Sequence, residues 1–222
     1  QPQDFQIIKG RKNAKILSVE PLKTSKEIGL NIVLVVDNSF SMKQRKAIQP
    51  LLSALEEFYS IVRPMDNIHA VVFDQKNTID VNGRKMHART FQSSNVSEMR
   101  NFFKESFFED LTNGTFLYDS MAVGLDIIRR MPEKSNKFMV VFSDGKDINS
   151  TVDEAGVQAL ARGIPNFSAY CLDFTQAKSM DAFLKAFADK NNGRIWKAAS
   201  SSELLPIFKS LLSDGFNRPD VY

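Results

Sequence analysis

One carboxylate and two hydroxyls follow an aliphatic run near the start of the chain. In NIVLVVDNSFSM, residues 31–42, the polar side chains Asp37, Ser39 and Ser41 occupy alternate positions directly after the apolar stretch. Side chains two residues apart in an extended segment turn toward the same side, so one short loop can present three oxygens to one centre. Oxygen donors without histidine or cysteine favour Mg²⁺, Ca²⁺ or Mn²⁺ over zinc.

Two later segments carry the same kinds of oxygen. The candidate ligands are Thr112, Thr115 and Asp119 in TNGTFLYDS, and Ser143, Asp144 and Asp147 in SDGKD. Each segment alone has an ordinary structural explanation, because Asp, Ser and Thr commonly cap helices and form turns. The first and third segments follow predicted strands directly, and the second opens a predicted helix. Together they predict one site for a hard cation.

Apolar, β-branched or aromatic runs alternate with segments of helical spacing along the chain. The strand-like runs are residues 30–37, 68–74, 137–144, 166–174 and 193–199. The helical patterns are residues 44–62, 95–111, 116–131, 152–163, 179–191 and 201–212. Because the strand-like runs are apolar nearly throughout, they predict parallel strands covered by helices on both faces. The expected fold class is α/β, a doubly wound and mostly parallel sheet.

Two segments leave local alternatives open. Residues 75–93 alternate more weakly around a turn-prone VNGR, which indicates a hairpin or an antiparallel edge strand. Pro50 lies inside the helical pattern at 44–62, where it predicts either a kink or a late helix start. Ligands of doubly wound sheets bind beyond the carboxyl ends of the strands, which is where the loops carrying Asp37 and Asp144 are expected.

Length and composition predict one domain with additional chain at its ends. The chain has 222 residues, 43% hydrophobic and 25% charged, enough for one substantial core. We expect the domain to span residues 29–213. Residues 1–28 form an N-terminal extension in which 14–22 can add an edge strand, and residues 214–222 form a tail or linker.

Composition also argues against several classes of function. A net charge of +3, from 29 basic and 26 acidic residues without a block of like charges, does not favour nucleic acid as a partner. No apolar run approaches the roughly 18 residues that a membrane span requires. Cys171 is the only cysteine, which excludes an intrachain disulfide, and its apolar surroundings predict a buried structural thiol.

The three polar segments resemble those of a von Willebrand factor A domain, over about residues 29 to 213. The resemblance is carried by VVDNSFSM, NGTFLYDSM and MVVFSDGKD. In that family these loops form the metal-ion-dependent adhesion site. The resemblance implies that the ion is Mg²⁺, with Mn²⁺ or Ca²⁺ as alternatives. The implied ligands are the hydroxyls of Ser39, Ser41 and Thr115, together with Asp37 and Asp144 directly or through water.

Two residues near these motifs need separate interpretation. Family members often have glycine between the two serines, where this chain has Phe40. If that position required a positive φ, phenylalanine would be strained. The loop is then rearranged or the ring lies over the site, and packing of the ring into the interior is an equal alternative. Asp119 is interpreted as a charge in the first turn of a helix rather than as a ligand.

The predicted function is a non-catalytic, divalent-cation-dependent protein-binding module for adhesion or assembly, whose ion is bridged to an acidic side chain of a partner. One alternative is a metal-independent scaffold with a vestigial site. Another is a Mg²⁺-dependent phosphotransferase or phosphatase, since aspartyl-phosphate enzymes place their nucleophile after a first strand. Those enzymes of the haloacid-dehalogenase type require a second Asp where this chain has Ser39. The resemblance also suggests a bacterial protein of the periplasm or cell surface.

Overall fold

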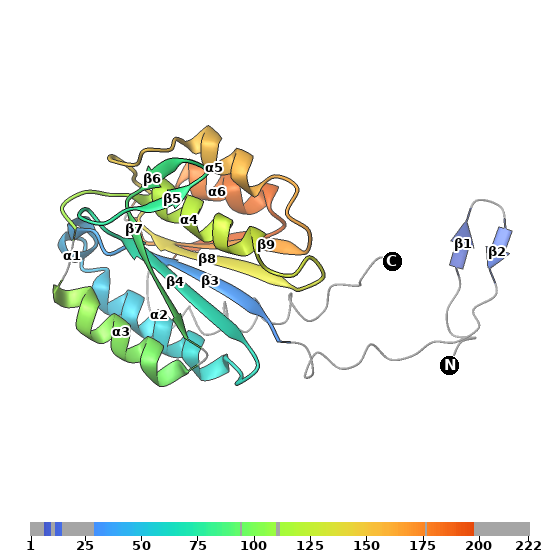
Figure 1. Cartoon of the computed structure of the whole chain (residues 1–222), viewed down its shortest axis with the longest axis horizontal. Helices are drawn as coiled ribbons and strands as arrows, with labels where there is room; N and C mark the ends of the chain where they lie inside the picture. The colour runs from blue at the N-terminus through green and yellow to red at the C-terminus, as the bar shows by residue number, and fades with distance from the viewer. Residues whose placement is uncertain are drawn as a thin grey trace.

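A six-stranded sheet forms the centre of the molecule (Figure 1). The computed structural model describes residues 7–9, 12–14, 29–93, 95–109, 112–175 and 177–197. The strands are β3 (Asn31–Val36), β4 (Asn67–Phe73), β7 (Ala88–Ser93), β8 (Lys137–Ser143), β9 (Phe167–Asp173) and β10 (Arg194–Lys197). Their order is β10-β9-β8-β3-β4-β7, and every pairing is parallel except β4 with β7. The predicted α/β, doubly wound sheet with one antiparallel edge strand is confirmed.

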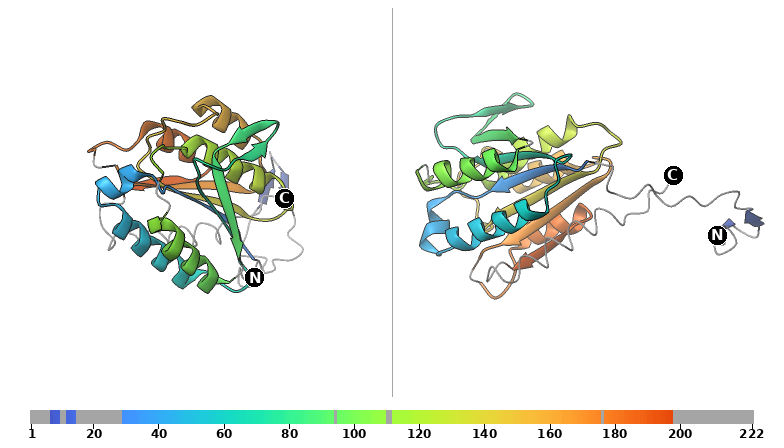
Figure 2. Two further views of the ribbon diagram at one scale, coloured as in Figure 1. Left: turned by 60° about the vertical axis from the view of Figure 1, so that its left-hand side comes forward. Right: turned by 90° about the horizontal axis from the view of Figure 1, so that it is seen from below.

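Helices cover both faces of this sheet (Figure 1; Figure 2, left). One face carries α1 (Phe40–Gln44), α2 (Ile48–Ile61) and α3 (Val96–Glu109), and the other carries α4 (Leu117–Arg129), α5 (Glu154–Ala161) and α6 (Ala182–Lys190). Alternate residues of β3 serve the two faces: Ile32 and Leu34 pack with α2 and α3, and Val33 and Val35 pack with α4. Burial on both faces explains why the predicted strands are apolar nearly throughout.

The strand order reverses beside β3. From β3 the chain first builds outward through β4 to β7, and it then returns to place β8 on the other side of β3. Val36 is in register with Phe142, and the Asp37 N–H donates to the Phe142 carbonyl at 2.9 Å. The carboxyl ends of β3 and β8 therefore adjoin at the switch point where such sheets bind ligands.

Both alternatives for residues 75–93 are realised. Strands β5 (Ile79–Val81) and β6 (Arg84–Met86) form an antiparallel hairpin, and β7 then adds the antiparallel edge strand. Asn82 and Gly83 join the hairpin with φ values of 54° and 80°. A two-residue type I′ turn needs positive φ at both central positions, which asparagine and glycine tolerate best.

The helical pattern at 44–62 is divided. Helix α1 ends before Lys46, whose φ is 55°, and α2 begins at Ile48. Pro50 is thus the third residue of α2, where its missing N–H costs no intrahelical hydrogen bond. Of the two alternatives predicted for Pro50, a kink or a late helix start, the late start is correct.

The remaining predictions have mixed outcomes. Cys171 is free and buried as predicted, and burial raises the pKa of its thiol.

Near the N-terminus, β1 (Ile7–Lys9) pairs with β2 (Lys12–Ala14). The strand predicted at 14–22 lies outside the described residues except for Ala14, and so do the predicted helix at 201–212 and the tail at 214–222. The domain boundaries stay a prediction.

Candidate metal site and its scaffold

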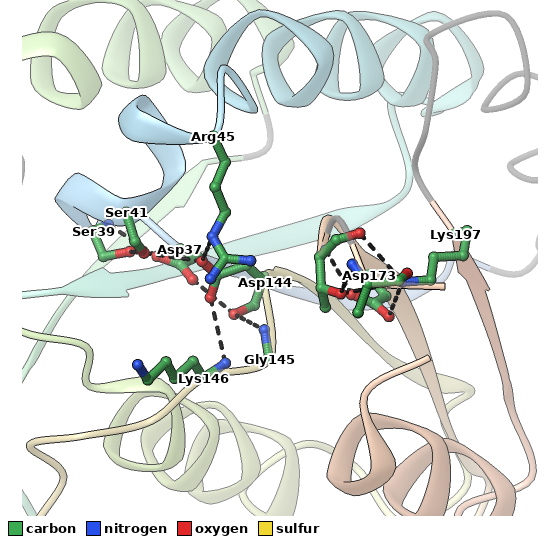
Figure 3. A network of polar contacts seen from close by, with 12 residues as sticks. Asp37, Ser39, Ser41, Arg45, Asp144, Gly145, Lys146, Asp173 and Lys197 are labelled. Atoms are coloured by element: carbon green, nitrogen blue, oxygen red, sulfur yellow. Dashed lines mark hydrogen bonds and ion pairs between the residues drawn. The ribbon is translucent and has the colours of Figure 1, made fainter. Parts of the chain in front are cut away.

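Four of the five predicted ligands form one hydrogen-bonded network at the carboxyl ends of β3 and β8 (Figure 3). The hydroxyl oxygens of Ser39 and Ser41 lie 2.8 Å apart, and the Ser41 hydroxyl donates to Asp144 Oδ2 at 3.0 Å. Asp37 accepts from the Ser39 N–H at 2.9 Å. Residues more than a hundred positions apart in the sequence thus meet at one edge of the sheet.

Asp37 is the innermost member of this network. Its side chain is fully buried, and its second oxygen accepts from the Ser143 hydroxyl at 2.7 Å. Burial, with a contribution from the negative charge of Asp144, raises the pKa of Asp37 to about 6, against the lowering effect of its hydrogen bonds. Two carboxyl groups are therefore held close together in a poorly solvated place, where a cation would stabilise their ionised forms.

Thr115, the fifth predicted ligand, lies on the turn between these two loops and is 5% exposed. Its carbonyl accepts from the N–H groups of Ile148 and Asn149 at 3.3 and 3.1 Å. The same turn is joined to the first loop, since the Phe40 N–H donates to the Thr112 carbonyl at 2.8 Å. The structure brings the three loops together by backbone hydrogen bonds. The side chain of Thr115 takes no part in the network of Asp37 and Asp144 within the described chain.

The donor set fits a small hard cation. Mg²⁺ takes oxygen ligands at roughly 2.1 Å in an octahedron, which places adjacent ligand oxygens about 2.9 Å apart. The 2.8 Å separation of the Ser39 and Ser41 hydroxyls matches two adjacent vertices. Within the described residues, no group of three or more His, Cys, Asp and Glu side chains is arranged to hold a metal. A site here depends on hydroxyls as well as carboxylates.

Two further residues contact the carboxylates of the site. Ser143, a candidate oxygen donor from the sequence, donates its hydroxyl to Asp37 and accepts from the Gly145 N–H at 3.1 Å. The other residue, Arg45, was missed by the sequence analysis. Arg45 extends from the end of α1 and places its Nε 3.1 Å from Asp144 Oδ2 (Figure 3). Arg45 follows Ser41 by one helical turn, but nothing in the sequence indicates that its side chain turns back toward the loop.

Asp119 and Asp147, which were also candidate oxygens, have scaffold roles. Asp119 is fully buried and accepts from the N–H groups of Thr151, Val152 and His87 at 2.8, 3.1 and 2.8 Å. Asp147 accepts from the Tyr118 N–H at 2.9 Å, in the first turn of α4. The interpretation of Asp119 as a first-turn residue rather than a ligand agrees with this geometry, but its bonds go mainly to neighbouring loops.

Phe40 resolves the question of the missing glycine. Phe40 is the first residue of α1 and lies outside the positive-φ region, so phenylalanine causes no backbone strain. Its side chain is 43% exposed, so the alternative that the ring packs into the interior is wrong. The helix begins here, directly after Ser39, and its first turn directs the ring toward solvent at the edge of the site.

Another buried carboxylate lies at the carboxyl end of the strand beside β8. Asp173, at the end of β9, accepts from the N–H groups of Thr175 and Asp181 at 2.8 and 3.0 Å and pairs with Lys197 at 3.2 Å (Figure 3). These partners are backbone groups and one ammonium, without a serine or threonine hydroxyl among them. This cluster fixes the β9 loop rather than presenting oxygens.

Comparison with known proteins places the chain in a family. The model of the von Willebrand factor type A domain matches residues 31–210. The chain therefore belongs to the von Willebrand factor type A domain family, as its motifs predicted. No curated protein matches the sequence as a relative.

Solved structures share the fold at low sequence identity. A von Willebrand factor type A protein from Catenulispora acidiphila is 18% identical with a TM-score of 0.63, over 86% of this chain and 44% of that one. The pilus adhesin SpaC from Lactobacillus rhamnosus GG is 14% identical with a TM-score of 0.62, over 87% and 31%. Proximal thread matrix protein 1 from the mussel byssus, with a zinc-occupied MIDAS motif, is 14% identical with a TM-score of 0.57, over 83% and 47%. The chain thus spans less than half the length of these three proteins.

Proposed function

We propose that the protein is a non-catalytic module that binds a partner protein through a divalent cation, in adhesion or assembly. Asp37, Ser39, Ser41, Thr115 and Asp144 would hold the ion, which we expect to be Mg²⁺, with Mn²⁺ or Ca²⁺ as alternatives. The observation that carries the proposal is the pair of serine hydroxyls 2.8 Å apart at the switch point of the sheet, of which that of Ser41 donates to Asp144.

The composition of the site favours an acidic side chain as the partner's contribution. Three of the five groups are neutral hydroxyls, and Mg²⁺ keeps several waters where protein carboxylates are few. A water position can be taken by a carboxylate oxygen from another protein, which adds negative charge that the hydroxyls lack. The bridging Asp or Glu then completes both the coordination and the charge.

Exposed apolar side chains at the same edge of the sheet indicate what surrounds that acid. Phe40 and Ile148 are 43% and 64% exposed, and they directly adjoin Ser39 and the backbone contacts of Thr115. Met180 is 38% exposed and precedes Asp181, which packs against Gly145. Apolar groups at the rim favour a partner segment whose acidic residue has apolar neighbours.

Thermal unfolding with and without ions tests the cation. A ligand that binds only the native state stabilises it by about 2.7 kcal/mol at a hundred times its dissociation constant, or several degrees in unfolding temperature. We expect Mg²⁺ and Mn²⁺ at millimolar concentration to raise the unfolding temperature and EDTA to reverse the change. Identical unfolding temperatures in EDTA and in both ions would contradict the proposal and favour the metal-independent scaffold.

Selection from a random peptide library tests the partner chemistry. In Mn²⁺ the enriched peptides should carry Asp or Glu beside apolar residues, and EDTA should release them. Replacing Phe40 and Ile148 together by serine should weaken binding of an enriched peptide by about 10-fold, because two exposed apolar contacts are lost. Met65→Ser is the matched control: Met65 is 48% exposed but precedes β4, at the opposite edge of the sheet. Equal losses in both variants would argue against a rim contact.

The absence of catalysis and the cellular location are parts of the same proposal. A screen against phosphate esters with Mg²⁺ tests the phosphotransferase alternative, and turnover that requires Asp37 would replace the binding function. We propose a bacterial, extracytoplasmic protein on the basis of its similarity to a pilus adhesin and other proteins of this fold. No helix within the described residues has the length and apolar character needed to cross a membrane.

A further inference from the structure

We propose that Arg45 is a built-in counter-ion of Asp144 that competes with the divalent cation, so that the cation binds weakly alone and more tightly when a carboxylate from the partner receives the guanidinium. The inference rests on the proposed function of the same site. Arg45 would set how strongly binding of the ion and binding of the partner depend on each other.

Asp144 is shared between a predicted metal ligand and a positively charged side chain. Oδ2 accepts from the Ser41 hydroxyl at 3.0 Å and pairs with Arg45 Nε at 3.1 Å, and Oδ1 accepts from the Lys146 N–H at 3.3 Å. The guanidinium thus shares one carboxylate oxygen with a predicted metal ligand (Figure 3). A cation beside Ser41 and Asp144 would have to replace or repel this group.

The positive charge of Arg45 opposes a cation bound at Asp144. The guanidinium is positive at every accessible pH, so it cannot leave the site by losing a proton. The side chain of Asp144 is fully buried, whereas that of Arg45 is 32% exposed. Repulsion between the guanidinium and a dication at this position is weakly screened on the buried side and relieved only by movement of Arg45.

Displacement of Arg45 by a cation would involve its side chain and not its backbone. Its backbone is fixed at the end of α1 by its N–H, which donates to the Ser41 carbonyl at 3.0 Å. The side chain is the movable part, and its exposed portion borders solvent. An arginine held at the rim presents a planar fork that suits a carboxylate. A partner's acid that binds the ion would offer the displaced guanidinium a new partner.

Asp173 provides an internal contrast. Its cation, Lys197, also donates to the carbonyls of Thr175 and Ala177 at 3.2 and 2.7 Å, and it therefore serves the loop as well as the carboxylate. Asp173 bonds otherwise to backbone N–H groups. Asp144 instead has a hydroxyl and a guanidinium on one oxygen. The loop's backbone N–H of Lys146 bonds to the other oxygen, Oδ1, so the hydroxyl and the guanidinium share an oxygen that this backbone bond does not use.

Calorimetric titration with Mn²⁺ alone tests the competition. Removing one adjacent positive charge should strengthen cation binding, so Arg45→Gln is expected to bind Mn²⁺ about 10-fold more tightly than the wild-type chain. Arg45→Lys keeps the charge and should stay close to wild type. Arg100→Gln is the matched control, since Arg100 is 34% exposed and pairs with Glu56 away from the site. That variant should bind Mn²⁺ within about twofold of wild type.

Acetate tests the link to the partner's acid. At constant ionic strength, acetate should raise the Mn²⁺ affinity of the wild-type chain by several-fold more than that of Arg45→Gln, with chloride as the reference anion. Equal enhancement in both chains would overturn the transfer of Arg45 to the incoming carboxylate.

The outcomes separate this inference from the proposed function. Mn²⁺ binding by the wild-type chain with unchanged or weaker binding by Arg45→Gln overturns the counter-ion role and leaves the proposed function standing. Failure of both chains to bind Mn²⁺ overturns the proposed function itself. Thermal unfolding in EDTA establishes that each variant is folded, so that an altered affinity reflects the site.

Discussion

Replacing Ser39 and Ser41 together by alanine is expected to lower the affinity for Mn²⁺ by at least about 100-fold. The two hydroxyls are the proposed adjacent ligands, and their oxygens lie 2.8 Å apart. Even groups that only orient a ligand change metal affinity by about 10- to 100-fold when mutated, and loss of two direct ligands should cost no less. The remaining carboxylates would still attract a cation, but without two of its fixed vertices. Calorimetric titration measures the loss.

The same double variant should remain folded. The hydrogen bond lost between Ser41 and Asp144 contributes about 1 kcal/mol, and Arg45 still pairs with Asp144. Ser60→Ala is the matched control, because the Ser60 hydroxyl bonds to the nearby Glu57 carbonyl on the exposed surface of α2. It should leave Mn²⁺ affinity unchanged. Wild-type Mn²⁺ affinity in the double variant would show that the ion binds elsewhere.

Asp119→Ala should destabilise the protein by about 3 to 5 kcal/mol. The fully buried carboxylate accepts three backbone N–H groups, from His87 and from Thr151 and Val152. Alanine leaves these donors without an acceptor, and each unsatisfied buried group costs roughly 1 to 3 kcal/mol. These hydrogen bonds connect α4 to the residue that follows β6 and to the segment between β8 and α5. Urea denaturation, monitored by circular dichroism, measures the change in the free energy of unfolding.

Another aspartate of α4 supplies the control. Asp126 pairs with Arg130 at 2.6 Å across one helical turn, and the arginine side chain is 74% exposed. Exposed pairs of this kind contribute about 0 to 1 kcal/mol, so Asp126→Ala should have a small effect. Asp119→Asn keeps one acceptor oxygen and should fall between the two alanine variants. Similar free energies of unfolding for Asp119→Ala and Asp126→Ala would refute the scaffold role of Asp119.

The predicted arrangement of strands and helices was largely correct because burial leaves a direct trace in sequence. A strand covered on both faces has no solvent-facing positions, and the central residues of β3 and β8, 32–36 and 138–142, are accordingly all apolar. The division of residues 44–62 was less visible. It depends on the left-handed backbone of Lys46, which no residue preference at that position announces.

The oxygen-rich loops were also recognisable from sequence alone, since Asp37 and Asp144 each follow such a run directly. Parallel strands end at the same edge of a sheet, so the meeting of the first and third loops follows from the predicted topology. The sequence does not show whether each carboxylate serves as a ligand or as an acceptor for the surrounding loops. Asp119, Asp144 and Asp147 are the same residue type, the first in the opening turn of α4 and the other two in the loop after β8.

Only the tertiary structure separated them, because the function of a carboxylate depends on which donors reach it. Asp119 receives backbone N–H groups from loops distant in the sequence. Asp147 receives the Tyr118 N–H of α4 and the N–H and hydroxyl of the nearby Ser150. Asp144 instead receives the Ser41 hydroxyl and the Arg45 guanidinium from the first loop and the end of α1. Residue type and local spacing determined the fold class and the chemistry of the oxygens. The direction of side chains such as Arg45 and Phe40 was decided by how α1 starts and ends, which long-range packing sets and local sequence does not.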